Sequence, residues 1–251
     1  MSGRAVLVTG ASRGIGAAAA RAFAAAGDRV AVHYGASRAK AEAVARGLPG
    51  EGHALVGADL ADPEATRALV EQAEQELGGL DVLVNNAGVF VAHPVEDTSL
   101  EDWRRAWRET LAVNLVAPAD LAYLAARAMI RQGRGGAIVN VASRGAFRGE
   151  PDQPAYGASK AGLVALGQSL ARALGPHQIA VSTVAPGFTE TDMAAEALAG
   201  EEGARRRAES PLGRIATPEE VAAAIVYLAS PEAAMASGSV LDVNGASHLR
   251  M

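Results

Sequence analysis

The sequence has no cysteine, few aromatic residues and only two lysines, and each shortage limits what the chain can be. Without cysteine there can be no disulfide, no thiolate metal site and no cysteine nucleophile. Aromatic residues make up 4% of the chain while alanine is abundant, so we expect a core of small side chains and closely packed helices. Lys40 and Lys160 stand beside 21 arginines, which indicates that lysine is kept where arginine cannot replace it.

Charge and hydropathy exclude two classes of partner. Acidic residues outnumber basic ones, 28 against 23, and the net charge of −5 argues against nucleic acid. No run of about 18 apolar residues is present, so the sequence predicts no membrane span. A strand pattern begins almost at the first residue and leaves no room for a signal peptide, which favours a cytoplasmic location. We expect no metal ion.

Short valine-rich runs alternate with helical patterns along the chain. We expect strands at 4–9, 29–34, 53–58, 81–84, 137–142, 179–184 and 239–243. Helices are expected at 15–26, 37–47, 62–77, 100–131, 156–174 and 217–230, the fourth broken near 102–107. This order predicts an α/β fold with a single Rossmann-type, doubly wound parallel sheet of about seven strands and helices on both faces. No linker or repeat divides residues 1–251, so we expect one domain.

Tyr156 and Lys160 stand four residues apart at the start of an expected helix, just beyond the strand that ends at Ser143. Residues at i and i+4 share one helix face, so the phenol and the ammonium would point into the same space. A nearby cation favours the phenolate, so Lys160 would lower the pKa of Tyr156 toward the range useful for general acid–base catalysis. Ser143 would donate a hydrogen bond to a developing oxyanion.

The alternative for this stretch is a surface Tyr–Lys pair at helical spacing beside an unrelated serine. With four tyrosines and two lysines in the chain, chance alone gives a Y-x-x-x-K pattern roughly 0.03 times. The functional interpretation is therefore favoured.

A glycine-rich loop between Thr9 and Gly16 joins the first strand to the first helix, with the spacing G-x-x-x-G-x-G. Such glycines let the backbone approach a pyrophosphate, and the helix N-terminus supplies N–H groups and a positive dipole. A tight turn without a ligand is the alternative. The position of the loop at the head of a βαβ unit favours dinucleotide binding.

The end of the second strand bears on the choice of dinucleotide. An NAD enzyme would place an acidic residue there, against the ribose 2′-hydroxyl, but the stretch from Tyr34 to Ser37 contains none. Arg13 and Arg38 could instead meet a 2′-phosphate, which arginine binds well, or they could be two solvated charges. NADP(H) is therefore expected rather than NAD(H).

With these motifs in order, the whole chain resembles the short-chain dehydrogenase/reductase family. Within that family it is most similar to the 3-oxoacyl-[acyl-carrier-protein] reductase type and related NADP-dependent ketoreductases. The matching motifs are Thr9-Gly10-x-x-x-Gly14-x-Gly16, Asp59-Leu60, Asn85-Asn86-Ala87-Gly88, Asn114, Ser143, Tyr156-x-x-x-Lys160 and Pro186-Gly187.

The resemblance implies a role for each site residue. Tyr156 would be the general acid/base, Ser143 would position the substrate carbonyl, and Lys160 would bind the nicotinamide ribose. Asn114 would hold a water in a proton relay leading from the lysine. Without the family, Asn114 could be an ordinary helix residue and Asp59 a helix N-terminal acid. The expected cofactor-binding residues are Gly10, Ser12, Arg13, Gly14, Ile15, Gly16, Tyr34, Asp59, Leu60, Asn86, Ala87, Gly88, Tyr156, Lys160, Pro186, Gly187, Thr189 and Thr191.

The resemblance also implies a reaction, NADPH-dependent reduction of a 3-oxoacyl thioester or similar small carbonyl to a secondary alcohol, with acyl carrier protein as a candidate partner. One alternative is an NAD(P)-dependent dehydrogenase of a sugar, steroid or other small alcohol. Another is a dinucleotide-binding regulator without catalysis.

Four residues bear on the substrate. Carrier-protein reductases tend to carry basic residues beside the active-site mouth. Arg134 matches one such position, but His177 stands where a second arginine often lies. Arg144 and Arg148, next to the serine, would favour an anionic substrate, or they would be solvated loop charges.

Two further expectations concern the lid and the assembly. The segment at about 187–213 is expected to close over the substrate as a mobile lid. Family members are commonly tetramers, so a homotetramer is expected. The small residues of the Tyr156 helix would allow close packing between subunits, or equally inside one subunit: Ala158, Ala161, Gly162, Ala165, Gly167 and Ala171.

Overall fold

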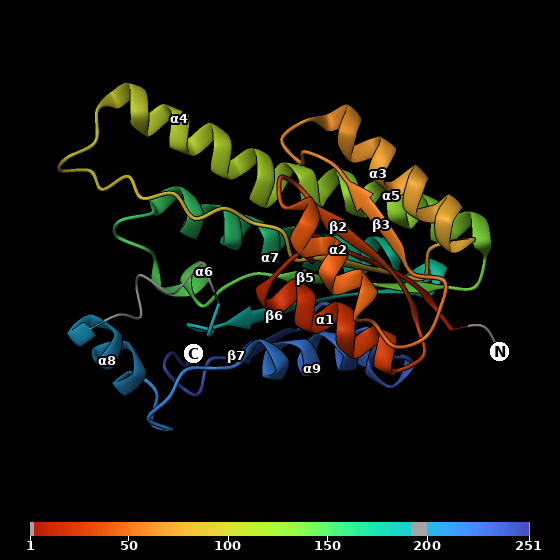
Figure 1. Cartoon of the computed structure of the whole chain (residues 1–251). Helices are drawn as coiled ribbons and strands as arrows, with labels where there is room; N and C mark the ends of the chain where they lie inside the picture. The colour runs from red at the N-terminus through yellow and green to blue at the C-terminus, as the bar shows by residue number, and fades with distance from the viewer. Residues whose placement is uncertain (1–2, 192–199, 251) are drawn as a thin grey trace.

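Seven parallel strands form one sheet in the computed structural model, which describes residues 3–191 and 200–250 (Figure 1). The order across the sheet is β3-β2-β1-β4-β5-β6-β7. Each strand expected from the sequence is present to within two residues at either end, so the predicted doubly wound α/β sheet is confirmed. The strands are β1 (Ala5–Val8), β2 (Arg29–Tyr34), β3 (Ala54–Gly57), β4 (Val82–Asn85), β5 (Gly136–Val141), β6 (Ile179–Pro186) and β7 (Val240–Val243).

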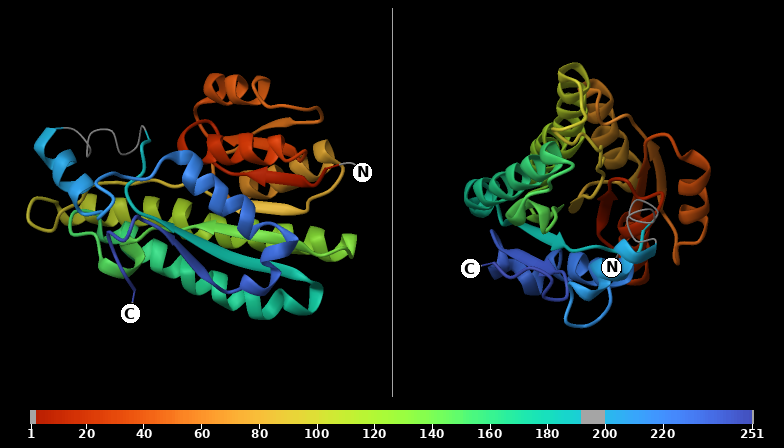
Figure 2. Two further views of the ribbon diagram at one scale, coloured as in Figure 1. Left: turned by 90° about the horizontal axis from the view of Figure 1, so that it is seen from below. Right: turned by 90° about the vertical axis from the view of Figure 1, so that its left-hand side faces the viewer.

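Helices cover both faces of the sheet because its strands are apolar on both sides (Figures 1 and 2). In β1, Val6 and Val8 belong to the core on one face, while Ala5 and Leu7 belong to the core on the other. The first core is closed by α1 (Gly14–Ala25), α2 (Arg38–Arg46) and α9 (Pro218–Leu228). The second is closed by α3 (Pro63–Leu77), α5 (Ala117–Gln132) and α7 (Pro154–Leu174).

Small side chains dominate the packing on the first face. The helices α1 and α9 lie against each other, and nearly every buried residue of α1 is glycine or alanine, with Phe23 as the exception. Helices approach closely when no long side chains separate them. The surface that α1 packs against α9 therefore consists mainly of small side chains, as the sequence predicts.

The long helical region runs without interruption from Leu100 to Gln132, so the expected break near 102–107 is wrong. It comprises α4 (Leu100–Leu111), a π-helical turn η1 (Ala112–Val116) and α5. The irregular turn lies just before Pro118, which lacks an N–H donor and so cannot keep the regular hydrogen-bond register. This turn carries Asn114, one of the expected catalytic residues.

By length and composition alone, this composite helix is able to cross a membrane. Half of its most apolar stretch is nevertheless buried inside the protein. Core helices of globular proteins pass the same test, so the finding is weak evidence for a membrane span.

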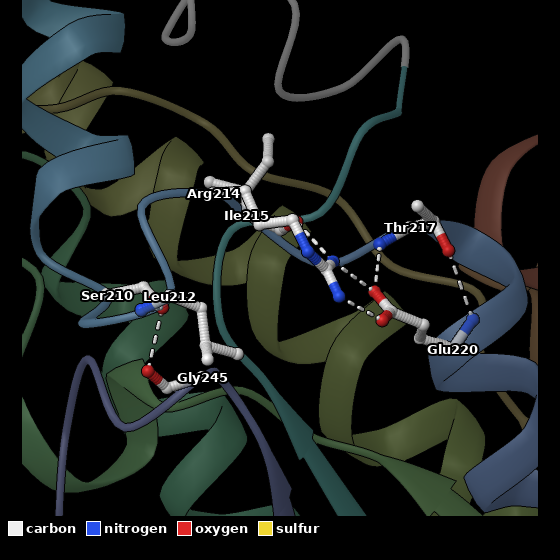
Figure 3. A network of polar contacts seen from close by, with 7 residues as sticks. All are labelled: Ser210, Leu212, Arg214, Ile215, Thr217, Glu220 and Gly245. Atoms are coloured by element: carbon white, nitrogen blue, oxygen red, sulfur yellow. Dashed lines mark hydrogen bonds and ion pairs between the residues drawn. The ribbon is translucent and has the colours of Figure 1, made fainter.

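The chain between α8 (Gly200–Ala208) and α9 is held by a network of polar contacts (Figure 3). Glu220 pairs with Arg214 at 2.6 Å, and its side chain also accepts a hydrogen bond from the backbone N–H of Thr217 at 2.9 Å. Thr217 caps the Glu220 N–H in return, which completes the capping box expected at the start of α9. Nearby, Ser210 donates to the Gly245 carbonyl at 2.7 Å.

The expected lid therefore has one firmly attached end. Its other end follows β6, where Thr189 forms an isolated bridge with Ala216. Residues 192–199 lie outside the described residues, so the motion of the segment at 187–213 stays a prediction. Three short elements complete the described chain, namely α6 (Gly145–Arg148), η2 (Gly175–His177) and η5 (Pro231–Ala236).

Candidate functional site

A cavity of about 740 Å³ lies at the carboxyl ends of the strands. It opens beside β1 and β4, where the strand order reverses and doubly wound sheets bind their ligands. Three expected site residues, Gly16, Tyr34 and Asn114, do not line this cavity. The others do, namely Gly10, Ser12, Arg13, Gly14, Ile15, Asp59, Leu60, Asn86, Ala87, Gly88, Ser143, Tyr156, Lys160, Pro186, Gly187, Thr189 and Thr191.

Gly16 serves packing inside the protein. A Cβ at this position would collide with the Gly10 carbonyl oxygen and with the Asn86 side-chain amide. That amide donates to the carbonyl oxygens of Thr9 at 2.8 Å and Gly10 at 3.3 Å. The third glycine of the loop thus lets Asn86 hold the loop, and it is not itself in the cavity wall.

Thr9 ties the end of β1 to the Asn85–Gly88 turn. Its hydroxyl accepts hydrogen bonds from the backbone N–H groups of Asn86 at 2.9 Å and Ala87 at 3.0 Å, and it donates to the Val84 carbonyl at 3.1 Å. The two motifs that the sequence separates by some 70 residues are therefore one hydrogen-bonded unit.

His33 holds the glycine loop from the other side, and the sequence reasoning missed it. Its Nδ1 accepts from the Gly10 N–H at 3.0 Å, so Nε2 carries the proton and donates to the Ala58 carbonyl at 3.1 Å. Burial lowers the pKa of His33 to about 4, so the ring is neutral near pH 7 and can play both parts. A histidine inside the apolar run R-V-A-V-H-Y was the signal available in the sequence.

The two arginines expected at a 2′-phosphate are separated by the fold. Arg13 lies in the cavity wall, whereas Arg38 lies outside it and pairs with Glu42 at 2.8 Å. Tyr34 also turns away, and its ring lies over Gly57 of β3. In its place Gly35, Ala36 and Ser37 line the cavity.

Asp59 is in the cavity wall and is not the cap of α3. Its Oδ1 accepts from the Ala61 N–H at 2.9 Å, while Asp62 caps the helix through the Glu64 N–H. The alternative reading of Asp59 as a helix N-terminal acid is therefore wrong. An exposed carboxylate beside buried Leu60 remains available to a ligand.

Ser143, Tyr156 and Lys160 come together at the opposite end of the cavity. Ser143 lies near enough to Tyr156 for its hydroxyl to lower the pKa of the phenol, and its Oγ accepts from the Gly145 N–H at 3.0 Å. Lys160 donates to the Val141 carbonyl at 2.9 Å, and its Nζ lies 5.6 Å from the centre of the Tyr156 ring. Phe90, which no motif indicated, meets the same ring edge-on at 4.8 Å between centres.

Burial moves the pKa values of the pair apart. It raises the pKa of Tyr156 to about 12, because the surrounding protein disfavours the phenolate more than the Ser143 hydrogen bond favours it. It lowers the pKa of Lys160 to about 8. The expected lowering of the tyrosine pKa by Lys160 is therefore wrong for the protein alone. Lys160 is itself buried, so its ammonium is disfavoured as well.

Asn114 is fully buried behind the cavity wall. Its side chain brackets the backbone of Val89, accepting from the N–H at 2.8 Å and donating to the carbonyl at 2.9 Å. It is therefore more than an ordinary helix residue, because it fixes the strand-end segment that carries Gly88. Its expected role in holding a water stays a prediction.

Arg144 is neither a solvated charge nor free to bind an anionic substrate. It is buried, pairs with Glu209 at 2.6 Å and donates to Ser247 at 2.7 Å. Its guanidinium also lies 4.9 Å from the centre of the Phe188 ring. Arg148 is exposed and shares Glu209 at 3.3 Å, so the expectation of two solvated loop charges is wrong for Arg144 alone.

Arg134 and His177 lie at the opposite edge of the sheet from the cavity. Arg134 pairs with Asp81 at 2.7 Å, just before β4, and His177 belongs to η2, just before β6. These are the amino ends of the strands. Within one chain, therefore, these residues do not flank the mouth of the site, contrary to expectation.

Comparisons with known proteins agree with this geometry. A family model described as enoyl-(acyl carrier protein) reductase matches residues 10–248. L-Rhamnose 1-dehydrogenase (NAD(P)(+)) from Azotobacter vinelandii is 42% identical over 96% of this chain and 94% of its own. The 3-oxoacyl-[acyl-carrier-protein] reductase of Vibrio cholerae is 38% identical over 99% of both chains. The crystal structure of a short chain dehydrogenase from Burkholderia cenocepacia in complex with NADP superposes with a TM-score of 0.88, at 39% identity and 98% coverage of both chains.

The chain belongs to the short-chain dehydrogenase/reductase family. It is an NAD(P)-dependent oxidoreductase of alcohol and carbonyl groups, which confirms the resemblance seen in the sequence.

The cavity fits a nicotinamide dinucleotide. The first turn of α1 points into it with no acidic residue and no side-chain cap, so its N–H groups suit an anionic pyrophosphate. Asp59 and Arg13 lie toward that end, and the Ser143–Tyr156–Lys160 group lies at the other. Thr191 lies beside Gly14 and so brings the segment after β6 against the glycine loop.

Proposed function

We propose that the protein reduces a small ketone to a secondary alcohol with NADPH as hydride donor. The proposal rests on one observation: the glycine loop and the residues Ser143, Tyr156 and Lys160 line the same cavity. A dinucleotide-binding regulator would not need a buried lysine beside a tyrosine in the same cavity wall, because keeping an ammonium out of water is costly.

When bound, NADPH supplies the hydride for the carbonyl carbon. Tyr156 gives its proton to the carbonyl oxygen, and Ser143 donates a hydrogen bond to the same oxygen as negative charge develops there. Lys160 in its cationic form stabilises the phenolate that remains. Asn114 holds the Val89 segment in place and, in this proposal, a water that returns the proton.

The direction of the pKa shift suits reduction. A phenol with a pKa of about 12 is protonated at neutral pH, so Tyr156 has a proton to give. For oxidation of an alcohol the same group must first lose its proton, which this environment disfavours. Binding of the cofactor and substrate changes that environment, so the reverse reaction is slower rather than forbidden.

The preference for NADP(H) is proposed from the second strand and Arg13. The turn after β2 offers Gly35, Ala36 and Ser37 to the cavity and no carboxylate. Arg13 supplies positive charge at that end, which suits a 2′-phosphate.

For the substrate, a 3-oxoacyl thioester is the first candidate, since one relative is named as a 3-oxoacyl-[acyl-carrier-protein] reductase. The second candidate is a sugar or other polyhydroxylated small molecule, since another relative is named as a rhamnose dehydrogenase. The Glu150 carboxylate in the cavity lining favours the second candidate. We further propose a cytoplasmic location and a homotetramer.

The proposal is tested by following NADPH absorbance with a short 3-oxoacyl thioester and with small ketones and hydroxyketones, then repeating each assay with NADH. We expect oxidation of NADPH at a higher kcat/KM than NADH. Replacing Arg13 by alanine should narrow that preference by about tenfold, as one charge-assisted contact is lost. Equal use of both cofactors would remove the role given to Arg13.

Tyr156→Phe should lower kcat by at least about 10³, because the proton donor is lost while the ring remains. NADPH binding, measured by fluorescence, should be nearly unchanged. Turnover close to that of the unaltered protein would refute the mechanism.

A further inference from the structure

A carboxylate that no motif indicated lines the substrate end of the cavity. Glu150 is half-buried in the connection between α6 and α7, in the same wall as Ser143 and Tyr156. It is close enough to Tyr156 for its negative charge to raise the pKa of the phenol. Phe90 and Phe188 line the same region.

The position of this side chain is fixed by its surroundings. Its carboxylate lies over Gly145, where a Cβ would collide with Oε1. The Glu150 carbonyl accepts from the Gln153 N–H at 3.1 Å, which closes a turn just before α7. Glu150 is therefore held at the wall and is not a loose surface charge.

The nearby arginines do not neutralise it. Arg144 and Arg148 bind Glu209 instead, and no hydrogen bond or ion pair joins the Glu150 carboxylate to another residue in the described part of the chain. Burial raises the pKa of Glu150 even though the charges of Arg148, Arg144 and Arg206 oppose the shift, and the charge of Glu209 adds to it. A hydrogen-bond acceptor thus faces the cavity without a donor from the protein.

We propose that Glu150 determines substrate specificity by accepting a hydrogen bond from a hydroxyl group next to the reacting carbonyl. The substrate class is then the α-hydroxyketones, and the vicinal diols in the reverse direction. This inference rests on the proposed function and narrows it.

The chemistry of the wall supports that class. An ionised carboxylate only accepts hydrogen bonds, so it pairs with a hydroxyl and repels a phosphate or carboxylate substrate. An unsubstituted alkyl ketone would displace water from Glu150 and offer it no hydrogen-bond donor. A polar group left unpaired in this way strongly lowers the kcat/KM for that substrate. The rings of Phe90 and Phe188 offer apolar surface to the C–H groups of the same molecule.

The test compares matched ketones that differ in one hydroxyl: 1-hydroxybutan-2-one with butan-2-one, and 1-hydroxypentan-2-one with pentan-2-one. We expect the unaltered protein to prefer the hydroxyketone in kcat/KM by on the order of 100-fold. Glu150→Gln, which keeps an acceptor without the charge, should lower that preference about tenfold. Glu150→Met should lower it to about one, with a higher kcat/KM for the plain ketones because no carboxylate is left unpaired.

Binding is measured separately from turnover. In a Tyr156→Phe background saturated with NADPH, calorimetry should show hydroxyketone affinity falling about tenfold on Glu150→Gln. Plain ketone affinity should rise, because the unpaired carboxylate is gone. Glu71→Gln, an exposed carboxylate on α3, is the matched control and should change neither ratio.

The outcomes separate the two proposals. Similar kcat/KM values for both members of each pair would overturn the inference and leave the reductase activity standing. If the protein reduces the 3-oxoacyl thioester but none of the four ketones, the inference is likewise overturned and the reductase activity stands. If NADPH is bound but no carbonyl compound is reduced, the proposed function falls and the inference falls with it.

Discussion

Burial of the Lys160 ammonium lowers the free energy of unfolding of the protein. The side chain is almost completely buried, and burial lowers its pKa from the usual 10.5 to about 8. The ammonium has one hydrogen bond, to the Val141 carbonyl, and no carboxylate partner is recorded for it among the described residues. Burial of this ammonium does not favour stability, which agrees with the role proposed for Lys160 in the reaction.

Lys160→Met should raise the free energy of unfolding at neutral pH by about 2 kcal/mol, since about 3 kcal/mol of desolvation is relieved and about 1 kcal/mol of hydrogen bonding is lost. Between about pH 8 and 10.5 the unfolded lysine binds more protons than the folded one, so the unaltered protein gains stability as pH rises and the difference narrows. Urea unfolding at neutral pH and near pH 9.5 measures both. If Lys160→Met is less stable than the unaltered protein, or if the stability difference grows with pH, Lys160 is not a destabilising buried ammonium.

Residues that belong to a fixed spacing were predictable, and residues that only the fold brings together were not. The spacing of their residues in the sequence predicts Tyr156, Lys160 and the glycine loop as site residues. No sequence motif contains Glu150 or Phe90. They belong to the site only because the fold places them in the lining of a cavity formed by several elements. Arg144 was misread because a sequence does not show that Glu209, 65 positions later, is its partner.

At the scale of elements, Glu209 joins two segments that flank the substrate end. It follows directly on α8, and it pairs with Arg144 and Arg148 at the two ends of α6. Ser143, the proposed hydrogen-bond donor to the substrate, immediately precedes Arg144. The position of α8 is therefore tied to the segment that holds Ser143.

Glu209→Gln should raise KM several-fold with little change in kcat, because α8 loses its attachment beside the substrate. It should also cost about 1–2 kcal/mol, since the buried Arg144 loses its charged partner while Glu209 itself is a third exposed. Steady-state kinetics and thermal unfolding measure the two effects. Arg148→Gln, which leaves the Arg144–Glu209 pair in place, is the control and should show the smaller change in both.

Element boundaries were predictable where capping residues mark them and unpredictable where hydrogen-bond register decides. The capping box of α9 was read directly from Thr217 and Glu220, and the strands were found from their valine-rich runs. The helix break expected near 102–107 is absent, and the π-helical turn before Pro118 was not predicted. Its cause is a shift in backbone pairing along one helix, and composition does not record such a shift.

At the scale of the whole molecule, α7 uses its small residues on both sides. Gly162 lies against Leu115, and Gly167 lies beside Asn140 and Thr183, so these two serve packing inside the chain. Ala158, Ala161 and Ala165 are exposed. At spacings of three and four residues they form one outward row, which is the surface the proposed tetramer would use.

Ala161→Arg should therefore reduce the assembly from a tetramer to dimers or monomers, because a long charged side chain would hold two such rows apart. Light scattering after size-exclusion chromatography measures the mass. Glu71→Arg adds the same side chain on the exposed face of α3 and should leave the mass unchanged. A tetramer that survives Ala161→Arg would place the interface elsewhere.

The alanine-rich face of α1, packed against α9, has a consequence at the level of codons. Any single-base change that replaces alanine, except the one to glycine, adds atoms to the side chain. In a core of leucine and phenylalanine, mutation often trims side chains and leaves cavities. Here it inserts volume between helices that already touch, at about 1–3 kcal/mol for each change. Inherited variation in this protein should therefore damage its core by crowding.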